Sequence, residues 1–515
     1  MNRDNLIAFS IFAISTAGFF LWGFKFIPSH HLLLFSVAAV FGIFMAFNIG
    51  GNDVANSFGT SVGAKTITIK QALVIAAIFE LSGAIFAGGE VTDTIRKGIV
   101  NIPSSDFDPM LFVLVMMSSL LSAGLWLFFA SKKGLPVSTT HSIVGGIVGA
   151  SLAMGYVVTN GDNVISMVSW SKIGQIAASW VISPLLGGIL SYGIYYYIKV
   201  NILTKSKNSV QRLDSIKSRL NYLKEAYKIT LKDKPADVQL NELKQLAHMN
   251  DDDEAKFETA SHYEKKIEKL KAEAKHIDVF AHLRKYIPLV GAFAASIISG
   301  MLLFKGLKHL KLAVSMIETI WIIFVIATAA YLISFAIINI MGKHDVHKAT
   351  LRIFSWLQIF TASAFAFSHG ANDIANAIGP FAAILDVLKT GEINAQAPVP
   401  IVAMATFGVA LIVGLWFLGK EVIQTVGTRL AKISPVTGFS AELGASAVIL
   451  LATKMGIPVS STHILIGAVL GIGLLNKDAN WGLMKPIALA WIITLPIAAV
   501  SSAVFFFILK VIVGI

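Results

Sequence analysis

Hydrophobic and polar positions follow one another along this chain in long blocks. Apolar runs of roughly 20 residues, enough to cross a ~30 Å hydrocarbon layer as a helix, recur throughout the sequence. The runs cover residues 6–23, 32–47, 72–88, 111–130, 143–158, 173–198, 287–304, 313–341, 359–367, 401–418, 444–452, 464–475 and 487–515. The alternating strands of about ten residues that build membrane barrels are not the pattern here. We therefore expect an all-α polytopic membrane protein with about 12 transmembrane helices, plus broken or re-entrant pieces where the runs are short or polar.

Composition strengthens this interpretation. Hydrophobic residues make up 55% of the chain and charged residues 14%, and the mean hydropathy is +0.72, whereas a soluble domain carries about 25% charged residues. No small-residue cleavage site follows the first apolar run, so we expect it to be retained as a helix. The chain has no cysteine, which excludes disulfides, thiol catalysis and cysteine-ligated metals.

One block is polar instead of apolar, and it divides the chain into three parts. Residues 201–285 are charged, with leucine and isoleucine at helical spacing, and they separate membrane halves at 1–200 and 286–515. Basic residues at both ends of this block predict a helical cytoplasmic loop. The net charge of +12 falls mainly on this loop and beside the apolar runs. It is better explained by membrane orientation and lipid headgroups than by nucleic acid.

Two short motifs place carboxylates and amides inside apolar sequence. The first is GGNDVANS at 50–57 and the second is HGANDIANA at 369–377. An unpaired buried amide or hydroxyl costs roughly 2–7 kcal/mol, and an unpaired charge costs more. Their oxygens suit alkali or alkaline-earth cations. The candidate cation ligands are Asn52, Asp53, Asn56, Asn372, Asp373 and Asn376.

A hydroxyl-rich motif follows each aspartate motif at nearly the same distance. The motifs read GLPVSTTH at 134–141 and GIPVSSTH at 456–463, and their first serines lie 85 and 87 residues after the aspartates. In each motif a proline, which suits the first position of a helix, precedes a run of hydroxyls. This pattern is typical of a helix start, where free backbone N–H groups hold anions. The candidate anion donors are Ser138, Thr139, Thr140, Ser460, Ser461 and Thr462. A third pair, WVISP at 180–184 and WIITLP at 491–496, supports an internal duplication.

Duplicated halves have a known use in membranes. In secondary transporters, inverted repeats build a substrate site at the bilayer midplane from broken helices. Carboxylates beside an anion repel it by roughly 3 kcal/mol per charge pair at ~5 Å and an effective dielectric of ~20. A bound cation would turn this repulsion into coupling, because such a site fills only when anion and cation arrive together. The pattern therefore predicts a symporter.

Other polar residues have competing interpretations. Glu80 and Glu442 are intramembrane acids and functional candidates, although they are not equivalent positions in the two repeats. His141 and His463 are expected to brace their motifs, whereas His369 is as much a ligand candidate as a structural residue. The asparagine motifs could instead be small-residue helix packing, and any single hydroxyl could bond the preceding turn of its helix.

Two other functional classes deserve comparison. A membrane serine protease could use Ser138 with His141, but a catalytic pair would not ordinarily be duplicated, and no Gly-x-Ser-x-Gly context surrounds the serine. An ion channel would show conductance without substrate coupling. We therefore expect a transporter with no enzymatic activity.

At these motifs the chain resembles the inorganic phosphate transporter family, which includes the type III sodium-phosphate cotransporters. The resemblance covers both halves, roughly 41–198 and 353–515, and is close to the sodium-coupled branch at GNDVANSFGT (51–60) and GFSAE (438–442). It implies a plasma-membrane symporter that imports inorganic phosphate with sodium as co-substrate, without a cofactor, as an inverted-repeat homodimer. A proton-coupled phosphate permease or a sulfate permease of the same fold remains the alternative.

The resemblance also assigns roles to individual residues. It implies a phosphate role for Glu80, Glu442 and His369, beside the hydroxyl motifs, and a sodium role for the two aspartates and their asparagines. Glu80 occupies a position where proton- or metal-phosphate-coupled bacterial relatives have asparagine, so it favours sodium. In the family that the chain resembles, alanine is common at the position of Gly51. This difference argues against an equal division of ligands between the two halves.

Overall fold

The computed structural model describes residues 3–87, 89–101, 108–232, 235, 258–309, 315–341, 345–394 and 399–515. The regular elements in these ranges are helices, and the one β-bridge outside them joins Val100 to Val168. Ten helical stretches in the described ranges are long and apolar enough to cross a membrane. The expected all-α membrane class is confirmed. The count of about 12 helices and the inverted relation of the repeats remain predictions.

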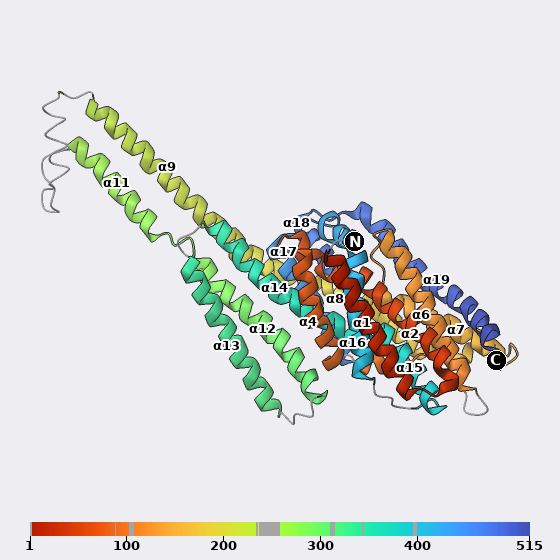
Figure 1. Ribbon diagram of the computed structural model, residues 1–515. Helices are drawn as coiled ribbons and strands as arrows, with labels where there is room; N and C mark the ends of the chain where they lie inside the picture. The colour runs from red at the N-terminus through yellow and green to blue at the C-terminus, as the bar shows by residue number, and fades with distance from the viewer. Residues whose placement is uncertain are drawn as a thin grey trace. The chain divides into compact units, whose positions relative to one another are not determined.

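The chain forms two compact units. Figure 1 colours its helices by residue number. The first unit comprises Met1–Tyr196, Gly291–Ala330 and Leu351–Ile515, and the second comprises Tyr197–Val290 and Tyr331–Thr350. All the candidate site residues belong to the first unit. The division into 1–200, 201–285 and 286–515 remains a prediction about how the chain is organised along its length.

Helices of the N-terminal half carry the first set of motifs. They are α1 (Arg3–Phe26), η1 (Ser29–His31), α2 (Leu32–Ile49), η2 (Gly50–Val54), α3 (Ala55–Gly63), α4 (Ile69–Ala87), α5 (Gly89–Lys97), α6 (Pro109–Lys132), α7 (Thr139–Val158), η3 (Val164–Met167) and α8 (Trp170–Ile198). The backbone stays helical from α2 to α3 but widens to a π-helix in η2, where the first aspartate lies. Such π-helical turns are frequent at functional sites.

Helices of the C-terminal half carry the second set. They are α12 (Ala281–His309), α13 (Met316–Met341), α14 (Val346–Asp373), α15 (Ala375–Thr390), α16 (Ile401–Gln424), η5 (Thr425–Arg429), α17 (Pro435–Lys454), α18 (Ser461–Asn476) and α19 (Trp481–Val513). Here α14 ends at the second aspartate and α15 begins two residues later. Both aspartates therefore lie at interruptions of long helices.

Burial separates core helices from peripheral ones. Within the most apolar 18-residue window, 89% of α17, 78% of α7 and 72% of α6 are buried, but only 6% of α13 is. A helix that is apolar all round and buried lies inside a bundle, whereas an exposed one of the same composition suits lipid. The hydroxyl-motif helices thus belong to the core of the first unit.

Two helical hairpins, α6–α7 and α17–α18, have matching turns. Gly134 and Gly456 follow the first helix of each hairpin with φ of 63° and 65°, the left-handed region that glycine tolerates. Ser138 and Ser460 cap the second helix by accepting from the backbone N–H groups of His141 and His463, at 3.1 and 3.3 Å. The predicted helix starts are confirmed, but the prolines lie two residues before the caps instead of at the first helical position.

Glycines let the second helix of each hairpin cross another helix closely. A Cβ at Gly149 of α7 would lie 2.0 Å from the carbonyl oxygen of Ala499 in α19. A Cβ at Gly471 of α18 would lie 2.3 Å from that of Gly188 in α8. Each glycine belongs to a G-x-x-x-G pair, the sequence that brings membrane helices into backbone contact. The two halves therefore repeat a packing mode as well as a sequence.

A second close crossing joins α4 to α14. A Cβ at Gly83 would lie 2.0 Å from the carbonyl oxygen of Phe367, and a Cβ at Gly370 would lie 2.0 Å from that of Glu80. Backbone contact of this kind fixes both helices in register. The crossing places the side chain of Glu80 against that of His369.

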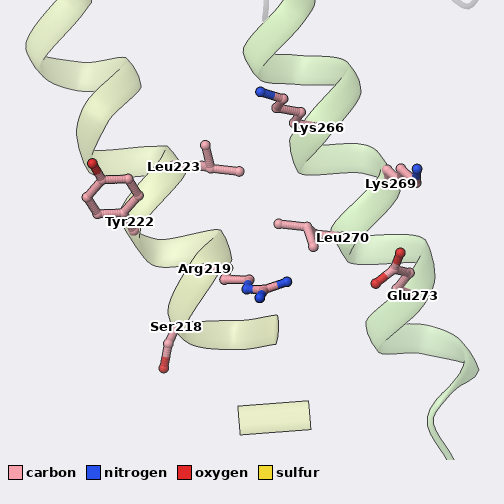
Figure 2. Close-up of a pocket in the computed structure, with 8 residues that line it drawn as sticks. All are labelled: Ser218, Arg219, Tyr222, Leu223, Lys266, Lys269, Leu270 and Glu273. Carbon is pink, nitrogen blue, oxygen red and sulfur yellow. The ribbon is translucent and has the colours of Figure 1, made fainter. Parts of the chain in front are cut away.

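The second unit contains a helical hairpin of α9 (Lys205–Lys232) and α11 (Glu258–His276), which lie side by side (Figure 1). In Figure 2, Leu223 and Leu270 point toward one another between the helices. The hollow there has a volume of about 650 Å³ and is also lined by Ser218, Arg219, Tyr222, Lys266, Lys269 and Glu273. The two leucines thus face each other in a hollow that charged side chains also line.

Candidate functional site

The two aspartates meet at one buried imidazole. His369 Nε2 lies 3.1 Å from Asp373 Oδ2 and 4.0 Å from Asp53 Oδ2. Its Nδ1 lies 2.7 Å from Glu80 Oε2, within hydrogen-bonding distance. All four side chains are buried to 3% exposure or less. The structure thus brings together both aspartates with Glu80 and His369 from the predicted set.

The charges in this cluster do not balance within it. Three carboxyl groups surround a single imidazole, which can carry one positive charge at most. One potential ligand atom each from Asp53, His369 and Asp373 lies within 4.8 Å of the others, a spacing compatible with one shared cation. His369 Nε2 and Asp373 Oδ2 make no hydrogen bond of good geometry with any described residue. The cluster can accept a cation or additional protons.

Hydroxyls of both motifs converge on Asp53. Thr139 donates to Oδ2 at 2.5 Å, whereas Thr462 and Ser461 of the other motif reach Oδ1, the latter at 3.4 Å. Thr140 is 3.5 Å from Asp373 Oδ1, at the limit of a hydrogen bond. The first aspartate therefore accepts hydrogen bonds from both halves of the chain.

The two hairpins also exchange hydrogen bonds directly. Thr140 donates to the carbonyl of Val459 at 2.8 Å, and Thr462, whose closer acceptor is Asp53, lies 3.3 Å from the carbonyl of Val137. Each carbonyl lies in the turn of the other hairpin. The first N–H groups of α7 and α18 have no partner within their own helices. The two helix starts consequently face one shared site, with hydroxyls and amide hydrogens as donors.

Asn376 joins this site from the second aspartate motif. Its Nδ2 donates to Thr139 Oγ1 at 3.0 Å and to Thr140 Oγ1 at 3.2 Å. Its Oδ1 is buried and receives no hydrogen bond from a described residue. This oxygen is therefore available to a cation or a hydroxyl donor. The side chain of Asn56, its predicted counterpart, lies outside the described residues.

Asn52 and Asn372 contact the hairpin turns. Asn52 accepts from the backbone N–H of Val137 at 3.0 Å, and Asn372 accepts from that of Val459 at 3.3 Å. Their amide groups also donate, Asn52 to Leu135 O and Ser131 Oγ, and Asn372 to Ile457 O and Thr453 Oγ1. The side chains thus hold each turn in place. Their role as sodium ligands remains a prediction, and the hydrogen bonds seen here are of the kind expected under the alternative interpretation, in which the asparagines bond across helices.

Ser138 and Ser460 have a similar local function. Their hydroxyls accept the backbone hydrogens that start α7 and α18, as described above. The remaining four hydroxyls of the two motifs, those of Thr139, Thr140, Ser461 and Thr462, face the aspartates. The predicted anion donors are therefore of two kinds, with the serine caps shaping the helix starts and the others facing the site.

Glu442 has different neighbours from the aspartates. Its carboxylate accepts from Thr60, Ser61 and Thr361 at 2.5–2.7 Å and from Gln358 Nε2 at 3.1 Å. It is fully buried, and no cationic side chain among the described residues forms an ion pair with it. These neutral donors come from both halves of the chain. The predicted phosphate ligands Glu80 and Glu442 therefore lie in different polar clusters.

Sequence reasoning missed the residues around Glu442. Gln358 is a long amide within an otherwise apolar stretch of α14, a signal for a functional or partnered residue in a membrane helix. Gly438 adds a second signal, because a Cβ there would lie 1.9 Å from Gln358 Nε2. Thr60 and Ser61 lie three and four residues after the end of the first aspartate motif. Their polarity was visible, but their partner on a distant helix was not.

The matching family and the similar proteins all have names that refer to phosphate transport. The profile of the phosphate transporter family matches residues 49–502. A protein of Mycobacterium bovis with the provisional name of phosphate permease is 49% identical over 508 residues, covering 96% of this chain and 91% of its own. The inorganic phosphate transporter 2-1 of Arabidopsis thaliana, described as chloroplastic, is 31% identical and covers 92% of this chain and 72% of its own.

A solved structure is similar along nearly the whole chain. It is described as the sodium-dependent phosphate transporter, and it superposes with a TM-score of 0.71 at 29% sequence identity. The match covers 93% of this chain and 100% of the solved chain. The similarity therefore includes the fold of both motif-bearing halves.

Proposed function

The chain belongs to the phosphate transporter family, and from this premise we propose that it is a secondary active symporter that imports inorganic phosphate together with sodium ions. Its family and its apolar helices make it a multi-pass integral membrane protein. Assembly as a homodimer in the plasma membrane is part of the proposal.

One observation carries this proposal. Asp53 accepts hydrogen bonds from hydroxyls that belong to both anion-facing helix starts. While the aspartate holds Thr139 and Thr462, those hydroxyls are not free to donate to phosphate. A sodium ion that binds the carboxylate would compete for the same oxygens and release the hydroxyls. Cation binding would thus create the donors that the anion needs, which is the coupling that symport requires.

Phosphate fits this donor set better than sulfate for a chemical reason. Both anions accept hydrogen bonds from hydroxyls and from the helix N-termini of α7 and α18. Hydrogen phosphate also carries a proton that it can donate to a carboxylate, whereas sulfate has none at neutral pH. In this proposal Glu80, which contacts His369 beside the aspartates, would accept that proton.

Sodium is the proposed coupling ion, and protons are the second candidate. The similarity to a sodium-dependent phosphate transporter and the presence of Glu80 favour sodium. The imidazole between three carboxyl groups favours protons, because a cluster of this kind can take up and release a proton. The two candidates differ in which gradient drives uptake.

A second cation position is proposed at Glu442. Hydroxyl and amide oxygens surround this buried carboxylate, whose charge is not neutralised by a described cationic side chain. Burying an unpaired carboxylate is costly, so it binds a cation or takes a proton. Hard oxygen ligands suit a small cation such as sodium. Glu442 would then act on sodium, and only indirectly on phosphate.

Uptake of labelled phosphate into proteoliposomes tests the function. The protein is reconstituted with an inward gradient of sodium, potassium or protons in separate experiments, with sulfate as competitor. We expect uptake that requires the sodium gradient and resists a tenfold excess of sulfate. Uptake driven by protons without sodium would replace the coupling ion, strong competition by sulfate would replace the substrate, and no uptake under any gradient would contradict the proposal.

A further inference from the structure

Four aromatic rings form a row where the two hairpins meet. The ring centroids of His141 and His463 are 4.5 Å apart, with the planes at 89°. Trp180 packs on His141 and Trp491 packs on His463, each at 3.8 Å between centroids. We call these four side chains the aromatic bridge. It combines one histidine and one tryptophan from each half, and so includes the third repeated motif, for which the proposed transport chemistry has no role.

A hydrogen bond ties the bridge to the hairpin turn of the first half. The indole Nε1 of Trp491 donates to the carbonyl of Pro136 at 3.4 Å, two residues before the capping serine. The helix α19 thus contacts both α7 and the turn that precedes it. Figure 1 shows these two helices next to each other.

The bridge lies next to the residues that face the ions. His141 directly follows Thr140, and His463 directly follows Thr462, the two threonines that contact the turn of the other hairpin. Both histidines are buried, with 6% and 3% exposure. Their Nε2 atoms contact no hydrogen-bonding partner among the described residues, so the rings serve neither the aspartates nor the capping serines.

We propose that the aromatic bridge positions the starts of α7 and α18 relative to each other, so that phosphate meets the donors of both helices at once. His141 and His463 are positioning residues in this view. An edge-to-face contact holds only over a narrow range of ring separations. If one helix start moved away, the threonine next to each ring would leave its contact on the other hairpin. This inference rests on the proposed phosphate transport.

Kinetics of bridge variants provide the test. His141→Leu, His463→Leu and the double variant are compared with wild type in labelled phosphate uptake at saturating sodium. We expect the KM for phosphate to rise about tenfold in each single variant while Vmax stays within about twofold. The double variant should be no worse than the poorer single variant, because either change breaks the same contact. His463→Phe keeps an aromatic ring and should stay within about twofold of wild type.

A matched control separates positioning from general packing. Phe35 is a fully buried aromatic residue on α2 that packs against Phe19 at 5.9 Å, away from the motifs. Phe35→Leu should lower thermal stability without changing the KM. Histidine variants that lose stability but keep the wild-type KM would overturn the inference, as would single effects that multiply in the double variant. If the Leu variants fold poorly, His141→Gln is measured instead, with the same expected rise in KM because it removes the ring while keeping a polar side chain.

Equilibrium binding distinguishes this inference from the proposed function. Labelled inorganic phosphate is titrated onto the purified protein in sodium-containing buffer. If wild type binds phosphate but shows no uptake, the transport proposal is contradicted. Weaker binding by the His463→Leu variant would still support the positioning role of the aromatic bridge. Equal binding by wild type and both single variants would contradict the bridge.

Discussion

Asp53 and Glu442 show how differently two buried carboxylates are stabilised in one molecule. Asp53 shares its imidazole neighbour with a second aspartate and accepts from hydroxyls of both hydroxyl motifs. Glu442 accepts only from neutral donors, which leaves its charge without a described ion-pair partner. We therefore expect the two carboxylates to influence transport in different ways.

Isosteric amide substitutions test this difference. Asp53→Asn removes the charge at the centre of the site and should lower sodium-driven uptake more than tenfold, the loss expected when a directly contacting group is removed. Glu442→Gln should raise the sodium concentration for half-maximal uptake and flatten the sodium activation curve. At saturating sodium its phosphate KM should stay within about twofold of wild type. Both curves come from labelled uptake in proteoliposomes.

A distant aspartate supplies the control. Asp386 near the end of α15 accepts from the backbone and side chain of Asn394, outside both clusters. Asp386→Asn should leave the sodium curve and the phosphate KM unchanged. A large increase of phosphate KM in Glu442→Gln at saturating sodium would support the phosphate role first expected for Glu442 and contradict the cation role.

The sequence singled out residues that the structure brings into one polar cluster, while their roles as ligands remain predictions. Repetition identified both aspartates and the hydroxyls, because a polar motif in apolar sequence is conspicuous. It could not show that Asn52 and Asn372 bind hairpin turns, since an amide can bind a turn or an ion equally well. Nor could it connect Gln358 to Glu442, which lie 84 residues apart on different helices.

At the scale of helices, close backbone crossings determine where the polar groups lie. The α4–α14 crossing brings Glu80 to His369 although 289 residues separate them. Its contact depends on two glycines, each facing a carbonyl oxygen of the other helix. Periodicity predicts that such helices exist, but which pairs cross is decided by tertiary packing that a single sequence does not reveal.

An added methyl group should open this crossing. Gly370→Ala would place a Cβ 2.0 Å from the carbonyl oxygen of Glu80, so the helices must separate. We expect a loss of about 1–3 kcal/mol in stability, typical of overpacking, together with reduced uptake. Thermal unfolding in detergent and labelled uptake measure the two effects.

Gly174 on α8 provides the control for the Gly370→Ala substitution. A Cβ there would meet nothing within 4 Å. Alanine is also favoured over glycine in a helix by about 1 kcal/mol. Gly174→Ala should therefore unfold at the wild-type temperature or slightly above it, with wild-type uptake. If Gly370→Ala behaved in the same way, the α4–α14 crossing would not control the position of Glu80.

For the molecule as a whole, the division into two units separates the site from the α9–α11 hairpin. The aspartate cluster, the Glu442 cluster and the aromatic bridge all belong to the first unit. None of the described residues of α9 and α11 belongs to any of them. Within the described part of the chain, the proposed site and the α9–α11 hairpin thus belong to different units.

Shortening the hairpin tests this separation. Residues 222–269 are replaced by a short glycine–serine linker, which joins α9 to α11 near the level where Arg219 and Glu273 line the same hollow. We expect the phosphate KM and the sodium dependence to stay within about twofold of wild type, because no site residue is removed. A folded variant that has lost uptake would show that the hairpin takes part in transport.

The exchange of hydrogen bonds between the hairpins has a consequence for how the protein is made. Thr140 needs the carbonyl of Val459, and Asp53 needs the hydroxyl of Thr462. At a ribosomal speed of about 5–20 residues per second, the second hairpin emerges roughly 15–65 s after the first. During that time the nascent first half holds a carboxylate in or near the bilayer without its final partners. Until translation of the second half completes the site, insertion factors or water must supply the contacts that this carboxylate lacks.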